Sequence, residues 1–593
     1  MDSRSAGALW AGAKGALTPS AVAGPSRLVH MSALCRQANS NAPPSDRPNS
    51  LATDSADRHC HQYNVDLFSI KPPQEHYRHP LVTAQELAVS SQRPKSVRML
   101  TRDFIHDSLY NPHYGYFSRH AVLLPESRDV LQNDRKGWDF KSFKNDEAFM
   151  RAVEDRYSDF EKLLPNMRCG EDHFLTEDAA VKGNFSTGTN RTGTGHSHKP
   201  RTPSPTSAAG LDAAKIKGRA AFERSQREDK NHDADVQSMV ARQVWHTPTE
   251  LFKPHYASIV AEHCIVSGGL YEQNNKPLVV FEFGAGSGAM AEDFLDYLLR
   301  THPEVYNRTQ YNVVEISKKL ANQQAKRLSR HRQAGRVKVH HYNFLDWKHR
   351  EDRECFVIGL EVLDNLSHDA VRYCTSTMQA YQTLVSIDST GDMHELFVPV
   401  QDSLIRRYLS TLSVLRPGIF SHPPGLPGYL SYLPGGLRRE LSSHFPFFPN
   451  LSPQPHFLPT HSLKLLDTLR TQFPRRRVIL SDFSSLPDAL KGINAPVVQT
   501  RIKGTAVDVK TYTVLQGFFD IFFPTDFELL KDFYVHDVLG SYASGERTGE
   551  QPRIMSHRDF LASHPELAKN CDLVKRGENP MLSWYENASW LVS

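Results

Sequence analysis

Short apolar runs alternate with helical patterns through the middle of the chain. The runs have the length and composition of buried strands and occupy residues 278–283, 311–316, 336–340, 355–360 and 477–481, with the last strands expected in 511–523. Helical spacing of apolar residues follows the first run, at Met290, Phe294, Leu295, Leu298 and Leu299. Strands that alternate with helices in this way predict an open, largely parallel α/β sheet.

A helix is predicted to begin just before the first strand. Thr247 and Glu250 have the spacing of a capping box, and Pro248 stands at the first helical position, where its missing N–H costs nothing. Pro254 is expected to kink or break the first turn.

Three glycines follow the first predicted strand directly, at Gly284, Gly286 and Gly288. Glycine permits positive φ and lets a ligand approach the backbone, so strand, glycine loop and helix together predict a nucleotide-binding βα unit. A plain tight turn is the alternative. Glu315, at the end of the second predicted strand, is placed where this fold holds ribose hydroxyls with a carboxylate.

The residues around the glycines favour one cofactor over another. Gly284, Gly286 and Ala289 also fit the dinucleotide pattern G-x-G-x-x-G/A, but Glu282 stands two residues earlier, and a carboxylate there is unfavourable beside a pyrophosphate. It suits a ligand with an amino group and a sulfonium. The run E-F-G-A-G-S-G resembles the first motif of class I methyltransferases that use S-adenosylmethionine. A nicotinamide-dependent oxidoreductase remains the alternative.

Five separated stretches resemble the MidA-like family of class I methyltransferases. They occur in the family's order, at 103–117, 247–252, 313–324, 359–369 and 516–527. The mitochondrial member of that family is a complex I assembly factor and protein arginine methyltransferase. The chain departs from the family pattern at Gly359, Leu360 and Ser367, and Glu250 is displaced by one position.

The resemblance implies a fold, a cofactor and a client. The fold is α/β, a Rossmann-like class I methyltransferase sheet with a helical N-terminal part and an inserted Pro-rich lid. The cofactor is S-adenosylmethionine, with the ribose on Glu315 and the adenine amino group on Asp346. The cofactor-binding residues are Glu282, Gly284, Gly286, Gly288, Glu315, Ser317 and Asp346. The client is a complex I subunit, methylated on arginine in the mitochondrial matrix during assembly.

The candidate catalytic residues lie just past the fourth predicted strand. Glu361 and Asp364 stand three apart, with Asn365 as a polar neighbour, and carboxylates that accept the N–H bonds of a guanidinium can orient it. Alternatively, Asp364 caps a helix that starts at Asn365. Tyr114 and Tyr116 line the path of the methyl acceptor or are core tyrosines with satisfied hydroxyls. A catalytically silent assembly scaffold of the same fold is a third possibility.

Composition narrows the function classes. The 593 residues include 70 basic and 66 acidic side chains, a net charge of +4, so a chain that coats nucleic acid is not expected. No apolar run of membrane-spanning length occurs, and the seven scattered cysteines form neither a disulfide framework nor a metal motif. Residues 3–45 lack acids, which is typical of a mitochondrial presequence or of an ordinary disordered tail.

These patterns predict a division of the chain into six parts. A presequence or disordered segment is expected at 1–50, and a helical N-terminal part of the catalytic domain at 51–120. An insertion with a disordered centre is expected at 121–245, since its polar middle cannot bury enough apolar surface to fold. The cofactor-binding core is predicted at 246–400, a Pro-rich lid at 401–475, and the remaining strands with a C-terminal extension at 476–593.

Overall fold

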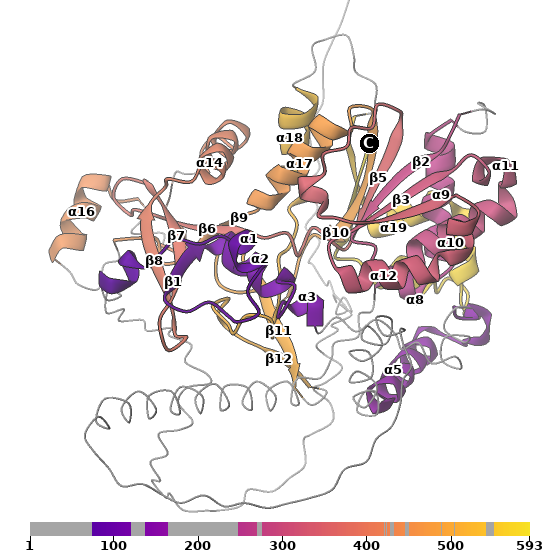
Figure 1. Ribbon diagram of the computed structural model, residues 1–593, viewed down its shortest axis with the longest axis horizontal. Coiled ribbons are helices and arrows are strands. Elements are labelled where there is room, and N and C mark those ends of the chain that lie inside the picture. The colour runs from indigo at the N-terminus through magenta and orange to yellow at the C-terminus, as the bar shows by residue number, and fades with distance from the viewer. Residues whose placement is uncertain are drawn as a thin grey trace, which may run out of the picture.

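The computed structural model describes residues 74–119, 137–163, 247–269, 276–419, 422, 424–426, 432–444, 450–487, 489–502, 505–540 and 551–593. The predicted presequence (1–50) and the polar centre of the 121–245 insertion lie outside the described residues. The described chain forms two halves side by side (Figure 1). One half is a seven-stranded sheet with helices on both faces, and the other contains two smaller antiparallel sheets.

The larger sheet has the order β14-β15-β10-β5-β2-β3-β4. Its strands are β2 (Val279–Phe283), β3 (Gln310–Glu315), β4 (Val337–His341), β5 (Cys355–Leu360), β10 (Arg476–Phe483), β14 (Arg553–Ser556) and β15 (Ala588–Val592). The five strands from β10 to β4 are parallel, β15 runs antiparallel to β10, and β14 runs antiparallel to β15. The strand order reverses between β2 and β5, the position at which open α/β sheets bind their ligands.

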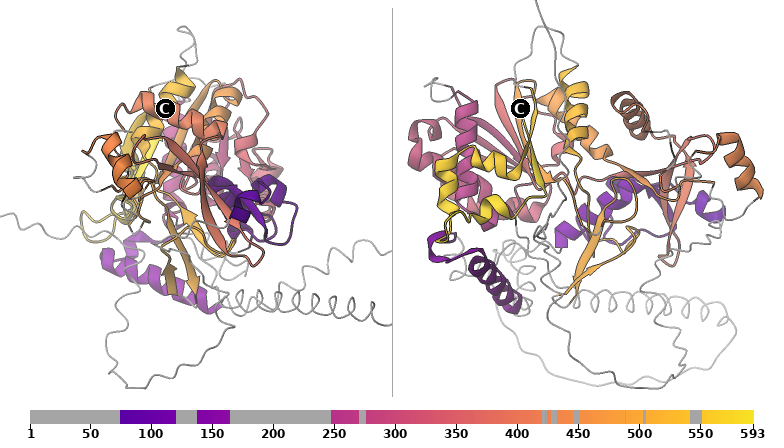
Figure 2. Two further views of the ribbon diagram at one scale, coloured as in Figure 1. Left: turned by 90° about the vertical axis from the view of Figure 1, so that its left-hand side faces the viewer. Right: turned by 180° about the vertical axis from the view of Figure 1, so that it is seen from behind.

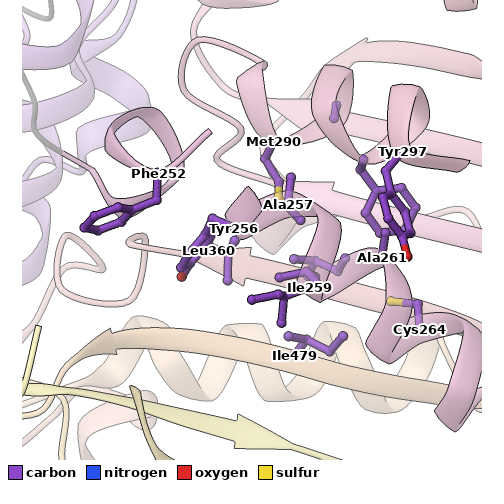
Figure 3. Close-up of a cluster of buried hydrophobic side chains, with 14 of the residues drawn as sticks. Phe252, Tyr256, Ala257, Ile259, Ala261, Cys264, Met290, Tyr297, Leu360 and Ile479 are labelled. Atoms are coloured by element: carbon purple, nitrogen blue, oxygen red, sulfur yellow. The ribbon is translucent and has the colours of Figure 1, made fainter. Parts of the chain in front are cut away.

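The core of this half lies on both faces of the sheet. Alternate residues of each strand point to opposite faces, so Val280, Ile358 and Ile479 join one buried cluster while Val357 and Val478 join the other. Figure 3 shows the first cluster, where Tyr256 and Ile259 of α9 and Met290 of α10 pack toward the strands. Burial on both faces explains why β5 is apolar throughout and β2 is apolar except at Glu282.

Helices cover the two faces. They are α8 (Pro248–Leu251), α9 (His255–Ser267), α10 (Ala289–Thr301), α11 (Pro303–Tyr306), α12 (Lys318–Arg327), α13 (Ser329–Gln333), η6 (Phe344–Asp346), α17 (Thr460–Gln472), α18 (Phe527–Phe533), η7 (Tyr534–Leu539), α19 (His557–Ala562), α20 (Pro565–Ala568), η8 (Lys569–Cys571) and α21 (Pro580–Ser583). The predicted start at Thr247 is confirmed, because its side chain accepts the Glu250 N–H. Pro254 separates α8 from α9, as its ring requires.

The second half is built around an antiparallel sheet in which β1, β6 and β8 all pair with β7, and β9 pairs with β6. Its strands are β1 (Val97–Leu100), β6 (Asp369–Tyr373), β7 (Ala380–Ile387), β8 (Met393–Pro399) and β9 (His456–Leu458). Residues 369–399, predicted within the cofactor-binding core, therefore belong to a different sheet. Their strands follow one another closely and pair as antiparallel neighbours, whereas parallel strands need a crossover between them.

The N-terminal part contributes to this second half. It contains η3 (Gln74–Arg78), α1 (Ala84–Leu87), α2 (Thr101–Tyr110) and α3 (Tyr116–Arg119). Besides these helices it supplies β1, which pairs with β7 through Val97 and Ile387. The chain thus begins and ends its described folded part in different halves of the molecule, with β15 in the large sheet (Figure 1).

The prediction that 511–523 supplies the last strands of the large sheet is wrong. β13 (Asp520–Phe522) pairs with β11 (Val497–Ile502), which also pairs with β12 (Thr505–Asp508), in a separate three-stranded sheet. The last strands of the large sheet are β14 and β15 instead. An apolar run shows that a strand will be buried but not which sheet it joins, because pairing is decided by tertiary contacts.

Two further ranges carry regular structure. Residues 401–475, predicted as a Pro-rich lid, include α14 (Ser403–Leu415), α16 (Gly435–His444), β9 and α17. The leucines of α17 are buried in the core beneath the sheet. In the predicted insertion, η4 (Phe140–Ser142) precedes α5 (Asp146–Leu163), which lies beside the larger half (Figure 2). Phe149 of α5 packs there against Phe252 and Trp584.

Within the described residues, no helix is long and apolar enough to cross a membrane.

Candidate active site

The glycine loop, residues 284–288, joins β2 to α10 at the point where the strand order reverses. Gly284, Gly286 and Gly288 have φ values of +70°, +52° and +80°, a region that side chains with a Cβ rarely adopt. A Cβ on Gly284 would lie 2.1 Å from Cγ1 of Val362, whereas one on Gly286 would meet nothing within 4 Å. The loop is therefore closed against the chain at Gly284 and open at Gly286.

Glu282 lies at the end of β2 and is buried. The Tyr311 hydroxyl donates to its Oε2 at 2.8 Å. Burial raises the pKa of Glu282 to about 7, and the nearby Glu315 adds to the increase. A cationic neighbour would lower the pKa of Glu282 again, because it favours the ionised carboxylate.

Glu315 ends β3 and Ser317 caps α12, so both lie beside the glycine loop. Glu315 accepts the Ser317 N–H at 2.8 Å and the Gln324 side-chain amide at 3.0 Å, while burial raises its pKa to about 7. The Ser317 hydroxyl accepts the Leu320 N–H.

Gln324 is a residue to which the sequence analysis gave no role. Its Nε2 also donates to the Gly286 carbonyl at 2.9 Å, and its buried Oε1 has no hydrogen-bond partner in the described chain. An unpartnered buried acceptor beside a glycine loop fits a ligand hydroxyl. The sequence could have indicated a role for Gln324, because this residue ends the family-like stretch 313–324.

Asp346 is placed differently from the other predicted cofactor residues. It ends η6 after β4, its side chain is exposed, and its Oδ2 accepts a hydrogen bond from Asn343 at 2.9 Å. The structure therefore puts it at the same end of the sheet but on the surface.

Glu250 connects α8 to the glycine loop. The Ser287 hydroxyl donates to its Oε1, and the buried Lys253 ammonium donates to its Oε2 at 2.7 Å. Arg327 of α12 completes the network, since it donates to the Ser287 hydroxyl at 3.0 Å and pairs with Glu292 of α10 at 2.7 Å. Glu250, predicted as a residue of the capping box, thus also holds Ser287 of the glycine loop in place.

The acidic loop, residues 361–368, follows β5. Glu361 has a φ of +54° and donates its N–H to the Ser481 carbonyl at 2.9 Å. The buried Asp482 carboxylate, at the end of β10, accepts the N–H groups of Leu363 and Asp364 at 2.7 and 3.1 Å. The alternative that Asp364 caps a helix is wrong, because no helix follows it: residues 364–365 form a turn, and β6 begins at Asp369.

Carboxyl groups crowd this loop. Burial, with the neighbouring Asp482, raises the pKa values of Glu361 and Asp364 well above their ordinary range. Burial also raises the pKa of Asp482 to about 6 and that of Asp520 in β13 to about 7. Asn365 follows Asp364 in the chain, and its side-chain amide donates to Asp520 Oδ1 at 3.2 Å.

Tyrosines surround the same carboxyl groups. The Tyr110 hydroxyl of α2 donates to the Asn365 carbonyl at 3.3 Å. Burial, and then the charge of Glu361, raises the pKa values of the Tyr256 and Tyr585 hydroxyls. Of the two tyrosines predicted from sequence, Tyr114 is a core residue, with its hydroxyl donating to the buried Asp107.

The five family-like stretches therefore converge on one place, although they are spread over 103–527. They supply Tyr110, Glu250, Glu315, the acidic loop and Asp520 to neighbouring positions at the carboxyl ends of β2, β3 and β5. No group of three or more potential metal ligands occurs in the described part of the chain. The site is one of carboxylates, amides and aromatic rings.

One departure from the family pattern has a direct physical reason. A Cβ on Gly359 of β5 would lie 2.4 Å from Cζ of Phe283. The glycine leaves room for the Phe283 ring, which stacks on Phe344 with a centroid separation of 4.5 Å.

The strand order and the glycine loop define a Rossmann-like methyltransferase sheet, and the comparisons with known proteins agree. Residues 259–541 match the family described as "Putative S-adenosyl-L-methionine-dependent methyltransferase". This match confirms the predicted fold class, the family resemblance and the cofactor S-adenosylmethionine.

Individual relatives are more distant. Over 247 residues the chain is 25% identical to the "Protein arginine methyltransferase NDUFAF7 homolog, mitochondrial" of Schizosaccharomyces pombe, covering 37% of this chain and 46% of that protein. The match thus spans less than half of the relative. Among solved structures, a Burkholderia thailandensis protein bound to S-adenosyl-homocysteine matches with a TM-score of 0.38 and 15% identity, over 59% of this chain and 78% of that one. The CcbJ methyltransferase of Streptomyces caelestis matches with a TM-score of 0.23 and 10% identity, over 59% and 92%.

Proposed function

We propose that this protein is a mitochondrial protein arginine methyltransferase that uses S-adenosylmethionine. One observation carries the proposal: Gly284 of the glycine loop lies against Val362 of the acidic loop, so a cofactor-binding loop and a group of carboxylates are in contact. Methyl transfer requires a donor and a nucleophile to be held next to each other.

The cofactor-binding residues each have a distinct task in this proposal. Gly286 leaves its surroundings open for the ligand, Glu282 meets the cationic amino acid end, and Glu315 with Gln324 binds ribose hydroxyls. Ser317 fixes the start of α12 and, through its N–H, the Glu315 carboxylate. Asp346 is exposed at the end of η6, where it is available to the adenine amino group. When bound, the cofactor supplies a methyl group activated by a sulfonium.

The acidic loop suits a guanidinium as the methyl acceptor. Glu361 and Asp364 are neutral or costly to ionise when alone, since burial raises their pKa values. A cation removes that cost because it favours the ionised carboxylates. Their oxygens can accept N–H bonds from one side of the guanidinium and localise its charge there. The remaining nitrogen is then available as the nucleophile, and Asn365 keeps the turn in place.

The client and the compartment rest on relatives. The matched Schizosaccharomyces pombe protein is named as a mitochondrial arginine methyltransferase, and the acid-free residues 3–45 are typical of a mitochondrial presequence. The MidA-like resemblance favours a complex I subunit as the client during assembly, in the matrix.

Calorimetric titration of the purified protein tests the cofactor. We expect micromolar binding of S-adenosylmethionine and its loss in Gly286→Val, whose side chain would occupy the open part of the glycine loop. Gly335→Val is the control, because Gly335 has a similar positive φ of +73°, also with nothing within 4 Å, but lies before β4. Binding of NADH instead would support an oxidoreductase and contradict the proposal.

A second assay separates an enzyme from a scaffold. Transfer of a labelled methyl group to mitochondrial extract protein should disappear in Glu361→Gln and Asp364→Asn, while S-adenosylhomocysteine affinity persists. Labelled arginine is identified by hydrolysis and mass spectrometry. Unchanged transfer in both variants would contradict the assigned roles, and label on a residue other than arginine would contradict the substrate class.

A further inference from the structure

The acidic loop is joined to β13 and the residue that follows it by several contacts. The Asn365 side-chain amide donates to both Asp520 Oδ1 and the Ile521 carbonyl, at 3.2 and 3.3 Å. The Phe523 N–H donates to the Asp364 carbonyl at 2.8 Å, and the Phe523 ring stacks on His368 with a centroid separation of 3.7 Å. The three-stranded sheet is thus docked directly on the acidic loop.

Two buried carboxyl oxygens at this junction have no hydrogen-bond partner among the residues that the structure describes. Asp364 and Asp520 are 5% and 0% exposed. Asp364 Oδ1 and Asp520 Oδ2 accept no hydrogen bond from the described residues. Unpartnered buried acceptors are costly, and each needs an explanation. Asp364 precedes Asn365 in the chain, and Asp520 accepts the hydrogen bond of the Asn365 amide. A single ligand bound beside Asn365 could therefore satisfy both oxygens.

We propose that Asp520 is a third carboxylate of the methyl-acceptor site, so that the large sheet and the three-stranded sheet together bind one guanidinium. This inference rests on the proposed function and extends it, because Asp520 lies outside the parallel sheet. Glu361 is partly exposed while Asp364 and Asp520 are buried, which places Glu361 on the outer side. A guanidinium enters with one edge toward the two unpartnered oxygens.

The arrangement favours a guanidinium over an ammonium. A guanidinium is planar and carries five N–H donors in a fixed fork, which can serve several carboxylates at once. A lysine ammonium has three donors around a single point charge. The Tyr110 hydroxyl lies at the Asn365 carbonyl, while its ring packs against Phe117 and His106. The site is therefore specific for the chemical class of arginine side chains.

Binding of a small arginine-like probe tests whether Asp520 contributes to guanidinium binding. The probe is Nα-acetyl-arginine amide, titrated into the full chain saturated with S-adenosylhomocysteine, with the neutral isostere Nα-acetyl-citrulline amide beside it. We expect the wild type to prefer the arginine probe, and Asp520→Asn to weaken its binding at least about tenfold, which corresponds to ~1.4 kcal/mol. Asp508→Asn is the matched control, because Asp508 lies in the same small sheet with an exposed side chain.

The outcomes separate this inference from the proposed function. Equal binding of the arginine probe by Asp520→Asn and Asp508→Asn would overturn the role of Asp520 only. A wild type that binds both probes equally would overturn the arginine assignment as well. Unchanged S-adenosylhomocysteine affinity in Asp520→Asn shows that the variant is folded.

A measurement on the wild type covers the case in which Asp520→Asn does not fold. Hydrogen–deuterium exchange should slow in the peptide 516–527 when the arginine probe binds, and it should not slow with the citrulline probe. Protection confined to the acidic loop would overturn the inference.

Discussion

Gly284 and Val362 lie in direct contact, although they follow different strands of the sheet. A Cβ added to Gly284 would come within 2.1 Å of Cγ1 of Val362. Gly284 opens the glycine loop after β2, and Val362 belongs to the acidic loop after β5. Because β2 and β5 are neighbours at the reversal of strand order, this contact brings the glycine loop and the acidic loop together.

Gly284→Ala should therefore destabilise the protein by more than backbone strain alone. Gly335→Ala is the control, since Gly335 has nearly the same φ, +73° against +70°, and nothing within 4 Å of its Cβ position. Overpacking costs about 1–3 kcal/mol, so Gly284→Ala should lose that much more than the control in denaturant unfolding. Adding Val362→Ala should recover part of the loss, and equal losses in both glycine variants would contradict the contact.

Gln324→Ala should weaken cofactor binding. The change removes the hydrogen bonds to Glu315 and to the Gly286 carbonyl, each worth on the order of 1 kcal/mol. We expect about a tenfold loss of S-adenosylhomocysteine affinity by calorimetry. Asn322→Ala, on the exposed face of the same helix, should leave the affinity unchanged. An equal effect of the two substitutions would mean that the helix, and not this side chain, supports binding.

Glu315 should make the cofactor-free protein less stable as the pH rises. Burial raises its pKa from 4.5 to about 7, so between these values the unfolded chain ionises while the folded chain stays protonated. The stabilisation is complete below pH 4.5 and is lost as the pH rises through about 7. Glu315→Gln removes this dependence, so the stability difference between wild type and variant should fall by up to about 3 kcal/mol from pH 4.5 to 8.

Denaturant unfolding at several pH values measures that difference. Glu304→Gln serves as the control, because Glu304 is exposed at the start of α11, and its variant should follow the wild type. A constant difference between wild type and Glu315→Gln across the range would show that the Glu315 carboxyl does not titrate as inferred.

Arg102→Ala should be strongly destabilising. Arg102 of α2 pairs with the fully buried Asp369 at 2.7 Å and with Asp402 at 2.6 Å, so its loss leaves a buried carboxyl without its counter-charge. Breaking a buried pair in this way costs about 3–5 kcal/mol. Thermal unfolding should show a large fall in Tm for Arg102→Ala.

An exposed ion pair provides the comparison for Arg102. Arg151 pairs with Glu147 on α5, with both side chains about two-thirds exposed. Such exposed pairs contribute less than about 1 kcal/mol, so Arg151→Ala should hardly change the Tm. Similar shifts in the two variants would contradict a structural role for the buried pair.

Much of the larger half could be predicted from local pattern. Short, mainly apolar runs marked β2, β3, β4, β5 and β10, because strands of a parallel sheet covered by helices are rich in apolar residues. Thr247 and Pro248 marked the start of α8 because caps are local chemistry. The glycine positions were correct for the same reason, since a positive φ at Gly284, Gly286 and Gly288 is a property of the backbone there.

The second half was less accessible to sequence reasoning. The apolar character of 369–399 and 511–523 indicated burial, but not that these strands form separate antiparallel sheets. The roles of Gln324 and Asp520 were also missed. Each depends on a partner far along the chain or across a loop, such as Asn365 for Asp520, and a single sequence gives no distance between them.

The sequence by itself determined the strands, caps and glycine turns of a methyltransferase sheet, because these follow from burial periodicity and backbone sterics within a few residues. Only the tertiary structure decided what stands around the cofactor loop. Tyr110, Glu250 and Asp520 come from three distant stretches and meet there through side-chain contacts. Such contacts form only when sheets and helices pack, so the composition of the site is a property of the fold.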